Sequence, residues 1–189
     1  MKSRGEIGAV FLDRDGVINR DSQAYVKSVE EMVFVPGSLA AIGRLTRRGV
    51  PVVVVTNQSA LGRGMITEAT LSGIHDHLKA AVARAGGNLL DIIHCPHAPA
   101  SGCHCRKPRT GMILEACRRH GFAPAASAFI GDSATDIECA RNAGCGQAIL
   151  VRSGLRDPTE TMRRRGLFPD HTADDLSAAV SWYLKRLSE

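Results

Sequence analysis

Short apolar runs alternate with helix-like segments along most of the 189 residues, and this alternation constrains the fold more than any other feature. The run PVVVVTN, residues 51–57, is almost continuously apolar and β-branched, which is typical of a parallel strand buried on both faces. Strands are predicted at residues 9–12, 52–55, 91–94, 128–130 and 148–151. Strands that alternate with helices predict an α/β fold: a three-layer, Rossmann-like sandwich with a mainly parallel sheet and right-handed crossovers.

Helix start and stop signals lie between these strands. Ser38 is a candidate N-cap for the helix that follows it, and Gly49 is placed to end that helix. Thr67 begins a second helix, which ends at a pair of glycines. Further helices are predicted over residues 111–120, 134–144 and 174–187. Ser133 or Asp132 can cap the helix that starts at 134.

The composition is that of an ordinary soluble domain, with 44% hydrophobic and 23% charged residues. A chain of this length predicts a single domain over residues 1–189. The formal net charge of +5 is modest, and aromatic residues make up only 4%. A nucleic-acid surface would need a longer basic stripe with interleaved aromatics. We therefore expect no nucleic-acid partner. We also expect the protein to be a monomer.

The beginning of the sequence, MKSRGEIGAVFLD, lacks the long apolar core and the small-residue cleavage site of a signal peptide. No segment approaches the roughly 20 apolar residues that span a bilayer. We therefore expect a cytoplasmic protein with no membrane partner. Because thiols stay reduced in that compartment unless they bind metal, the spacing of the six cysteines is informative.

Polar side chains gather where the predicted strands end. In open α/β sheets, ligands bind beyond the carboxyl ends of the strands, so these side chains are expected to lie at one rim. They are Asp13 and Asp15; Thr56, Asn57, Gln58 and Ser59; Arg106 and Lys107; and Asp132 and Asp136.

Asp13 and Asp15 follow the first strand and are separated by one residue, so in an extended chain they point to the same side. Two such carboxylates repel unless one is protonated or a cation lies between them. Mg²⁺ is a hard cation that binds through carboxylates and substrate phosphate oxygens. The alternative is a turn in which both carboxylates bind backbone amides, and the acids at neighbouring strand ends argue against it. Arg14, between the two, is expected to face the other way.

The other rim residues suit phosphate chemistry. The Thr56 hydroxyl and nearby amides can hold a phosphate oxygen, and the Lys107 ammonium can neutralise charge that develops at a phosphoryl group. Asp132 can ligate a metal, with Asp136 in support from the first turn of the next helix. Each residue also has a simpler interpretation as a turn former, a surface lysine or a helix cap. Their convergence at one rim favours the chemical interpretation.

The loop CPHAPASGCHC, residues 95–105, is dense in metal ligands. Its candidate ligands are Cys95, His97, Cys103 and Cys105. Three thiolates and one imidazole match a closed, tetrahedral Zn²⁺ site with a structural role. A disulfide is disfavoured in a reducing compartment, and a catalytic zinc needs an open position that four protein ligands do not leave. His94 and His104 are rival imidazoles.

Four segments, FLDRDGVIN, VVTNQS, CRKP and IGDSATD, occur in this order and resemble the four motifs of the haloacid dehalogenase (HAD) superfamily of phosphatases. With CPH and CHCRKP, the chain is similar to the zinc-containing branch of that superfamily, which acts on a heptose bisphosphate or on histidinol phosphate. The resemblance covers nearly the whole chain. It implies the HAD fold with no large cap domain and a short zinc-binding loop.

The resemblance also implies roles for individual residues. Asp13 would be the nucleophile that forms an aspartyl-phosphate, and Asp15 would act as the general acid and then as the base. Thr56 and Lys107 would bind the phosphoryl oxygens. The implied Mg²⁺ ligands are Asp13, the backbone carbonyl of Asp15, and Asp132, with Asp136 in support. The implied substrate contacts are Asp21, Tyr25, Asn57, Gln58, Ser59 and Arg106, with Arg63 a further candidate.

The substrate follows from finer similarities within that branch. TNQSALGRG and DRDGVIN resemble the heptose enzymes, whereas the short zinc loop and GDSATD are closer to the histidinol-phosphate enzymes. The expected function is removal of the 7-phosphate of a heptose 1,7-bisphosphate, a sugar phosphate on the route to lipopolysaccharide. Histidinol-phosphate phosphatase is the alternative, and Arg106 and Arg63 suit the bisphosphate better than a cationic substrate. A non-catalytic zinc module is a third reading, which the presence of both Asp13 and Asp15 disfavours.

Overall fold

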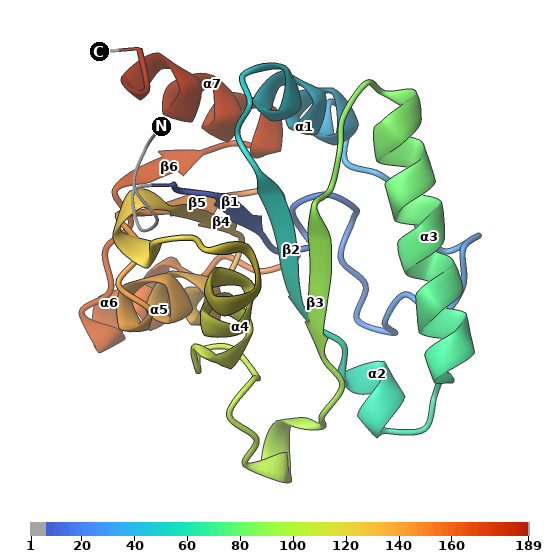
Figure 1. Cartoon of the computed structure of the whole chain (residues 1–189). Helices are drawn as coiled ribbons and strands as arrows, with labels where there is room; N and C mark the ends of the chain where they lie inside the picture. The colour runs from blue at the N-terminus through green and yellow to red at the C-terminus, as the bar shows by residue number, and fades with distance from the viewer. Residues whose placement is uncertain (1–6, 189) are drawn as a thin grey trace.

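The computed structural model describes residues 7–188, which form a six-stranded sheet between two layers of helices (Figure 1). The strands are β1 (Val10–Leu12), β2 (Val52–Asn57), β3 (Asp91–Cys95), β4 (Ala128–Gly131), β5 (Gln147–Val151) and β6 (His171–Ala173). Their order is β3-β2-β1-β4-β5-β6, and each neighbouring pair is parallel. The predicted three-layer α/β fold is confirmed. The sheet over these residues is wholly parallel rather than mainly so, and its edge strand β6 was not predicted.

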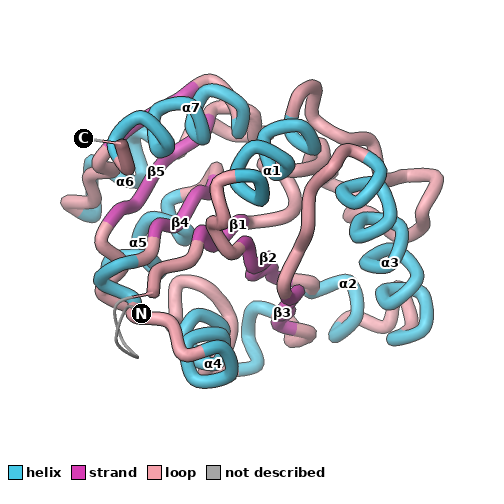
Figure 2. The backbone as a smooth tube through the Cα atoms, turned by 45° about the horizontal axis from the view of Figure 1, so that its top comes forward, coloured by secondary structure: helices cyan, strands magenta, loops and turns pink. Residues whose placement is uncertain are grey.

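The helices fall into two layers, one on each face of the sheet, and in Figure 2 the line of strands runs between most of them. The first layer holds α1 (Ser38–Arg47), α3 (Glu68–Arg84) and α7 (Leu176–Arg186). The second holds α4 (Gly111–His120), α5 (Ala134–Asn142) and α6 (Thr159–Arg165). Three short helical elements lie in the connections between the strands and the longer helices: α2 (Ser59–Gly62) and the 3-10 turns η1 (Pro99–Ser101) and η2 (Pro124–Ala126). Neither α2 nor α6 was predicted.

Alternating side chains of the central strands build a separate core on each face. Val10 and Leu12 pack into the layer of α1, α3 and α7, whereas Phe11 packs into the layer of α4, α5 and α6. All three side chains are fully buried. Because both faces of the sheet are covered, its central strands are apolar at nearly every position, and this is why the sequence pattern identifies them.

Two N-caps were predicted, at Ser38 and at Ser133 or Asp132, and the second is confirmed at Ser133. Thr67 caps α3 and Ser133 caps α5, each by accepting a hydrogen bond from an amide three residues on. The prediction that Ser38 caps α1 is wrong. Its buried hydroxyl instead donates to the carbonyl of Ile18 at 2.7 Å and so ties the loop after β1 to the helix layer.

No helix within residues 7–188 has the length and apolar character needed to cross a membrane. The signal-peptide expectation concerns the start of the chain, of which residues 1–6 lie outside the described range.

Candidate active site

A cleft of about 450 Å³ opens at the carboxyl ends of the central strands. Most of the predicted site residues line this cleft. Those that line it are Asp13, Asp15, Asp21, Tyr25, Thr56, Asn57, Gln58, Ser59, Arg106 and Asp132. Lys107 and Asp136 lie buried directly behind Asp13. Motifs as far apart in the chain as those of Asp13 and Asp132 therefore meet at one rim, because the carboxyl ends of parallel strands lie at the same edge of the sheet.

Three carboxylates cluster at the floor of the cleft, and two of them contact one buried ammonium. Asp13, Asp132 and Asp136 each place an oxygen within 4.8 Å of the others. The Nζ of Lys107 lies 2.8 Å from Oδ1 of Asp13 and 2.7 Å from Oδ1 of Asp136. The side chains of Lys107 and Asp136 are 2% and 0% exposed, so water hardly screens the pair. Burial lowers the pKa of Lys107, but the two carboxylates outweigh it and raise that pKa above its usual value.

Two of the acids that line the cleft, Asp13 and Asp132, are reluctant to ionise. Burial raises the pKa of Asp13 to about 7; Lys107 opposes this shift, and Asp136 adds to it. Burial and then the charge of Asp136 raise the pKa of Asp132 to about 9. One ammonium is too little positive charge for three carboxylates in this space. A further cation with a preference for oxygen ligands would relieve the repulsion, and Mg²⁺ is such a cation.

Two glycines let the backbone close around Asp132. A Cβ on Gly16, where φ is +81°, would lie 2.3 Å from Oδ2 of Asp132. A Cβ on Gly154 would lie 2.0 Å from the same atom. Both distances are far below contact, so any side chain at either position would displace the Asp132 carboxylate. The loops after β1 and β5 thus form a cradle around this acid.

Asp15 belongs to a separate ionic group. The Arg14 guanidinium donates to its Oδ1 from Nε at 3.1 Å and from Nη2 at 2.9 Å, and to its Oδ2 from Nη2 at 2.9 Å. The side-chain amides of Asn19 and Gln58 donate to it at 2.8 and 2.9 Å. Burial raises the pKa of Asp15, but Arg14 and these two amides outweigh burial and bring that pKa below its usual value.

The prediction that Arg14 faces away is therefore wrong. Arg14 is fully buried and is the counter-ion of Asp15. Alternation of side chains holds only along a strand, and β1 ends at Leu12. Beyond it the chain turns, and the amides of Ile18 and Asn19 donate to the Arg14 carbonyl. The charge of Asp15 does raise the pKa of Asp13, but it is the smallest of the causes, and the acids that cluster with Asp13 are Asp132 and Asp136.

The end of β2 connects the two ionic groups. The Gln58 amide that binds Asp15 also donates to Oγ1 of Thr56 at 2.9 Å. The Asn57 side chain accepts a hydrogen bond from the backbone amide of Lys107 at 3.1 Å. Part of the predicted substrate-binding segment therefore holds catalytic candidates in position.

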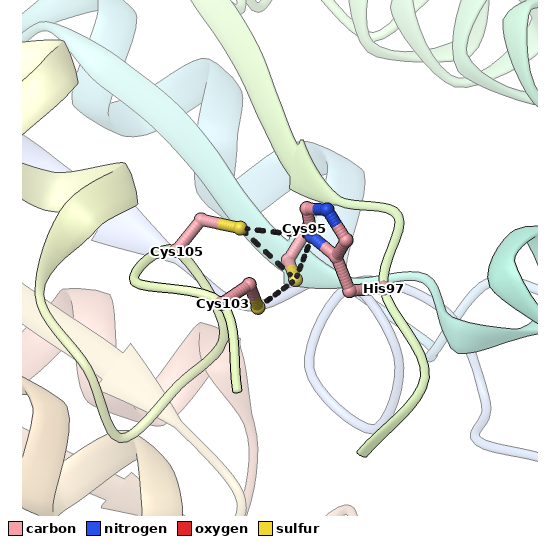
Figure 3. A group of neighbouring side chains, drawn as sticks. All are labelled: Cys95, His97, Cys103 and Cys105. Atoms are coloured by element: carbon pink, nitrogen blue, oxygen red, sulfur yellow. Dashed lines mark hydrogen bonds between the residues drawn. The ribbon is translucent and has the colours of Figure 1, made fainter. Parts of the chain in front are cut away.

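Figure 3 shows the four predicted loop ligands with their side chains directed toward one another. The Sγ atoms of Cys103 and Cys105 lie 3.6 and 3.3 Å from that of Cys95. The His97 Nδ1 lies 3.6 Å from the Cys95 sulfur and 3.3 Å from the Cys105 sulfur. A tetrahedral zinc with Zn–S of about 2.3 Å and Zn–N of about 2.0 Å separates its ligand atoms by roughly 3.5–3.8 Å. The four side chains thus fit a closed tetrahedral site, and none of these cysteines is in a disulfide.

The cleft contains one cation that the sequence analysis missed. Arg156 lines it together with Leu155, in the loop that follows β5. The signal was available, because β5 is another parallel strand and its carboxyl end faces the same rim. Arg63, in contrast, is exposed at the end of α2 and is not among the described residues that line the cleft.

A second cavity, of about 690 Å³, shares Leu155 and Arg156 with the cleft. Its lining is largely apolar and includes Leu150, Met162 and Phe168. None of the acids described above lines it, so the smaller cleft is the candidate active site.

A family model described as haloacid dehalogenase-like hydrolase matches residues 7–141, and a second, HAD-hydrolase-like model matches residues 104–179. The chain belongs to the haloacid dehalogenase-like hydrolases. The D-glycero-beta-D-manno-heptose-1,7-bisphosphate 7-phosphatase of Bordetella bronchiseptica is 44% identical over 178 residues, which are 93% of this chain and 97% of that protein. The protein of the same name from Pseudomonas aeruginosa is 41% identical over 179 residues, with coverages of 93% and 97%.

Solved structures of HAD hydrolases agree with these matches. The crystal structure of D,D-heptose 1,7-bisphosphate phosphatase from B. bronchiseptica, complexed with magnesium and phosphate, is similar with a TM-score of 0.88 and 42% identity. The similarity covers 95% of this chain and 99% of that one. The corresponding structure from Burkholderia thailandensis has a TM-score of 0.70 at 34% identity, with coverages of 96% and 99%. The predicted resemblance and the predicted class, a phosphoric monoester hydrolase, are confirmed.

Proposed function

We propose that this protein is a Mg²⁺-dependent phosphatase that hydrolyses the 7-phosphate of D-glycero-D-manno-heptose 1,7-bisphosphate, in the synthesis of lipopolysaccharide precursors. The observation that carries the proposal is the group of three acids, two of them in contact with Lys107, at the floor of a cleft of about 450 Å³. The chain that contains this group is 44% identical to a phosphatase of that name over 93% of its length.

Mg²⁺ fits the floor of the cleft, because its oxygen ligands are present and carry excess negative charge. Asp13, Asp132 and the backbone carbonyl of Asp15 would hold the ion. Asp136 supports them through Lys107, which it contacts at 2.7 Å. When bound, Mg²⁺ neutralises phosphate charge and so lets two anions approach each other.

In the first step, a carboxylate oxygen of Asp13 attacks the phosphorus, and the bond between phosphorus and the sugar oxygen breaks. Asp15 donates a proton to that oxygen. The negative charge of the bound phosphate raises the pKa of Asp15 from its low value in the free site, so the carboxyl takes up this proton when the substrate binds. Lys107 favours the ionised form of Asp13, and Thr56 donates to a phosphoryl oxygen.

In the second step, water attacks the phosphorus of the aspartyl-phosphate, and Asp15, now ionised, takes a proton from that water. The bond between phosphorus and Asp13 breaks, which restores the Asp13 carboxylate and releases inorganic phosphate. Asp15 then holds the proton that it gives to the next leaving group. The same carboxyl thus acts as the acid and then as the base.

The outer part of the cleft suits a second phosphate. Arg106 and Arg156 both line it, and we assign them to the 1-phosphate, with Arg63 as a more distant candidate. Asp21 and Tyr25 also line the cleft and offer polar groups to sugar hydroxyls. Asn57, Gln58 and Ser59 complete the proposed contacts. Histidinol phosphate would bring an ammonium toward the two arginines, which disfavours it as the substrate.

We further propose that Cys95, His97, Cys103 and Cys105 bind a structural Zn²⁺. The site would fix the loop that carries Arg106 and Lys107, since these two residues follow Cys105 directly. We expect the protein to act as a monomer, because the cleft and both ligand clusters are built from one chain.

The test compares Mg²⁺-dependent phosphate release from α- and β-heptose 1,7-bisphosphate, histidinol phosphate and a 5′-phosphorylated oligonucleotide. We expect kcat/KM to be highest for a heptose bisphosphate, with the heptose 1-phosphate as product. The Asp13→Asn variant should release no phosphate from any of them. A preference for histidinol phosphate would refute the substrate assignment, and full activity of Asp13→Asn would refute the covalent mechanism.

A further inference from the structure

We propose that Arg14 is a positioning residue that acts through Asp15: its guanidinium, backed by His75 of α3, fixes the Asp15 carboxyl in the orientation that proton transfer requires. The inference rests on the proposed function of Asp15 as acid and base. In it, the buried Arg14 side chain connects Asp15 to helix α3 on one face of the sheet.

The burial of Arg14 is the first observation. A fully buried arginine is rare, because the desolvated charge needs a partner. Among the described residues, the ion pair that Arg14 makes is the one with Asp15. The guanidinium therefore does not bind solvent or an incoming anion, and its positive charge interacts with the Asp15 carboxyl.

The second observation is the geometry of the pair. A guanidinium that contacts both oxygens of a carboxylate fixes the plane of the carboxylate as well as its position. Asn19 and Gln58 hold the same two oxygens from other directions. The Asp15 side chain keeps 21% of its surface exposed, on the side that lines the cleft. Only that side is left for a leaving group or a water.

His75 lies on the other side of the guanidinium. Its Nε2 is 3.5 Å from Nη1 of Arg14, the guanidinium nitrogen that makes no contact with Asp15. Burial and then the charge of Arg14 lower the pKa of His75 to about 3, so the ring is neutral and can accept from Arg14. Behind it, the His94 ring lies 5.5 Å away, between centroids. Helix α3 thus blocks the guanidinium from moving away from Asp15.

The structural alternative is that the pair serves folding alone. Buried ion pairs add little net stability compared with an apolar side chain of similar size, so stability is a weak reason for this arrangement. Orientation is a stronger one, since a displacement of about 1 Å of a catalytic group can cost about 10²-fold in rate.

The experiment separates these roles with Arg14→Lys, Asp15→Asn and the double variant. Lysine keeps the charge but lacks the planar fork of donors that fixes the plane of a carboxylate. We expect Arg14→Lys to lower kcat for the sugar bisphosphate by about 10²-fold, with KM changed by less than about threefold. Because Arg14 acts through Asp15, adding Arg14→Lys to Asp15→Asn should lower kcat no further. Equal losses in both backgrounds would overturn the proposal.

A second substrate, p-nitrophenyl phosphate, reports on each step separately. Its leaving group needs no proton, so the first step should survive in Arg14→Lys while hydrolysis of the phosphoenzyme is slowed. We expect a burst of nitrophenolate equal to the enzyme concentration, followed by a slow steady state. No burst, with both steps slowed equally, would indicate a folding defect and refute the positioning role. If the native protein hydrolyses this ester but no heptose bisphosphate, the proposed substrate fails while the role of Arg14 is still tested.

Variants outside the reaction centre complete the test. His75→Leu should lower kcat, though less than Arg14→Lys, and should also give the burst, whereas His75→Gln, which keeps an acceptor, should restore most of the rate. Arg44→Lys is the matched control, because Arg44 binds Ser177 and Ser181 far from the cleft and should leave both assays unchanged. A His75→Leu variant with native kcat and no burst would remove His75 from the proposal and contradict it.

Discussion

Replacement of Lys107 by methionine removes the one buried ammonium that touches Asp13 and Asp136. The substitution keeps the length of the side chain, so the packing against Phe129, whose ring centre lies 5.6 Å from Nζ, changes little. What changes is charge. Three acids with oxygens within 4.8 Å of one another lose the cation that contacts two of them, in a place where Asp136 is fully buried.

The cost follows from the burial of the pair. Removal of one partner of a buried ion pair costs about 3–5 kcal/mol, because the other charge stays buried without a partner. For a domain of this size each kcal/mol shifts Tm by about 2–4 °C, so a loss of roughly 6–20 °C is expected in the absence of metal. That is a large part of a typical total stability of about 5–15 kcal/mol. Added Mg²⁺ should restore more of the Tm in the variant than it adds to the native protein, since the ion replaces a missing charge.

The assay is thermal unfolding of both proteins near neutral pH, in EDTA and again with saturating Mg²⁺. Lys185→Met is the control, because Lys185 is exposed on α7 and far from the cleft. We expect kcat of Lys107→Met to fall by at least about 10²-fold, through loss of charge stabilisation in the transition state. A Tm in EDTA within about 2 °C of the native value would refute the assignment of Lys107 as the counter-ion of these acids.

Three further predictions concern the metals and the second phosphate. The raised pKa values of Asp13 (about 7) and Asp132 (about 9) mean that the folded protein keeps protons that the unfolded chain releases above about pH 4. In the metal-free protein, the contribution of these two groups to the free energy of unfolding therefore falls as the pH rises toward 9. Mg²⁺ competes with those protons, so the increase in Tm that Mg²⁺ causes should be larger at about pH 8 than at about pH 5.5. Equal increases at the two pH values would contradict the assignment of these acids to the Mg²⁺ site. Cys103→Ser should reduce bound zinc and Tm together, as measured by metal analysis and calorimetry; a native Tm after loss of zinc would contradict its structural role. Arg156→Gln should raise KM for the heptose bisphosphate about tenfold and leave KM for p-nitrophenyl phosphate unchanged, and equal changes for both would exclude contact with the second phosphate.

The parts of the fold that were predictable are those buried on both faces. The run at residues 52–55 lies in the middle of a covered sheet, so each of its side chains is apolar and the pattern is unambiguous. The edge strand His171–Ala173 has three residues and one buried side chain, so its sequence carries little strand signal. Helix α6 is short and rich in arginine, and its apolar contact with the core rests mainly on Met162.

The candidate site was predictable as a set of residues but not as a set of contacts. Motif order and strand ends brought Asp13, Asp132 and Lys107 to one rim, because the topology of a parallel sheet decides where strand ends meet. Which acid pairs with which cation depends on side-chain directions after the strand has ended. That is why Arg14 was expected to face away from Asp15. Arg156 was missed because its role depends on the course of a loop, and loops carry no periodic pattern.

The most direct test of the central claim is to trap the phosphoryl group on Asp13. In Asp15→Asn the proposed base for the second step is absent, so the aspartyl-phosphate should accumulate during reaction with p-nitrophenyl phosphate. After acid quenching, borohydride reduction and peptide mapping by mass spectrometry, we expect homoserine in place of Asp13 and of no other aspartate. Unmodified Asp13 in a sample that has released one nitrophenolate for each enzyme would contradict the account.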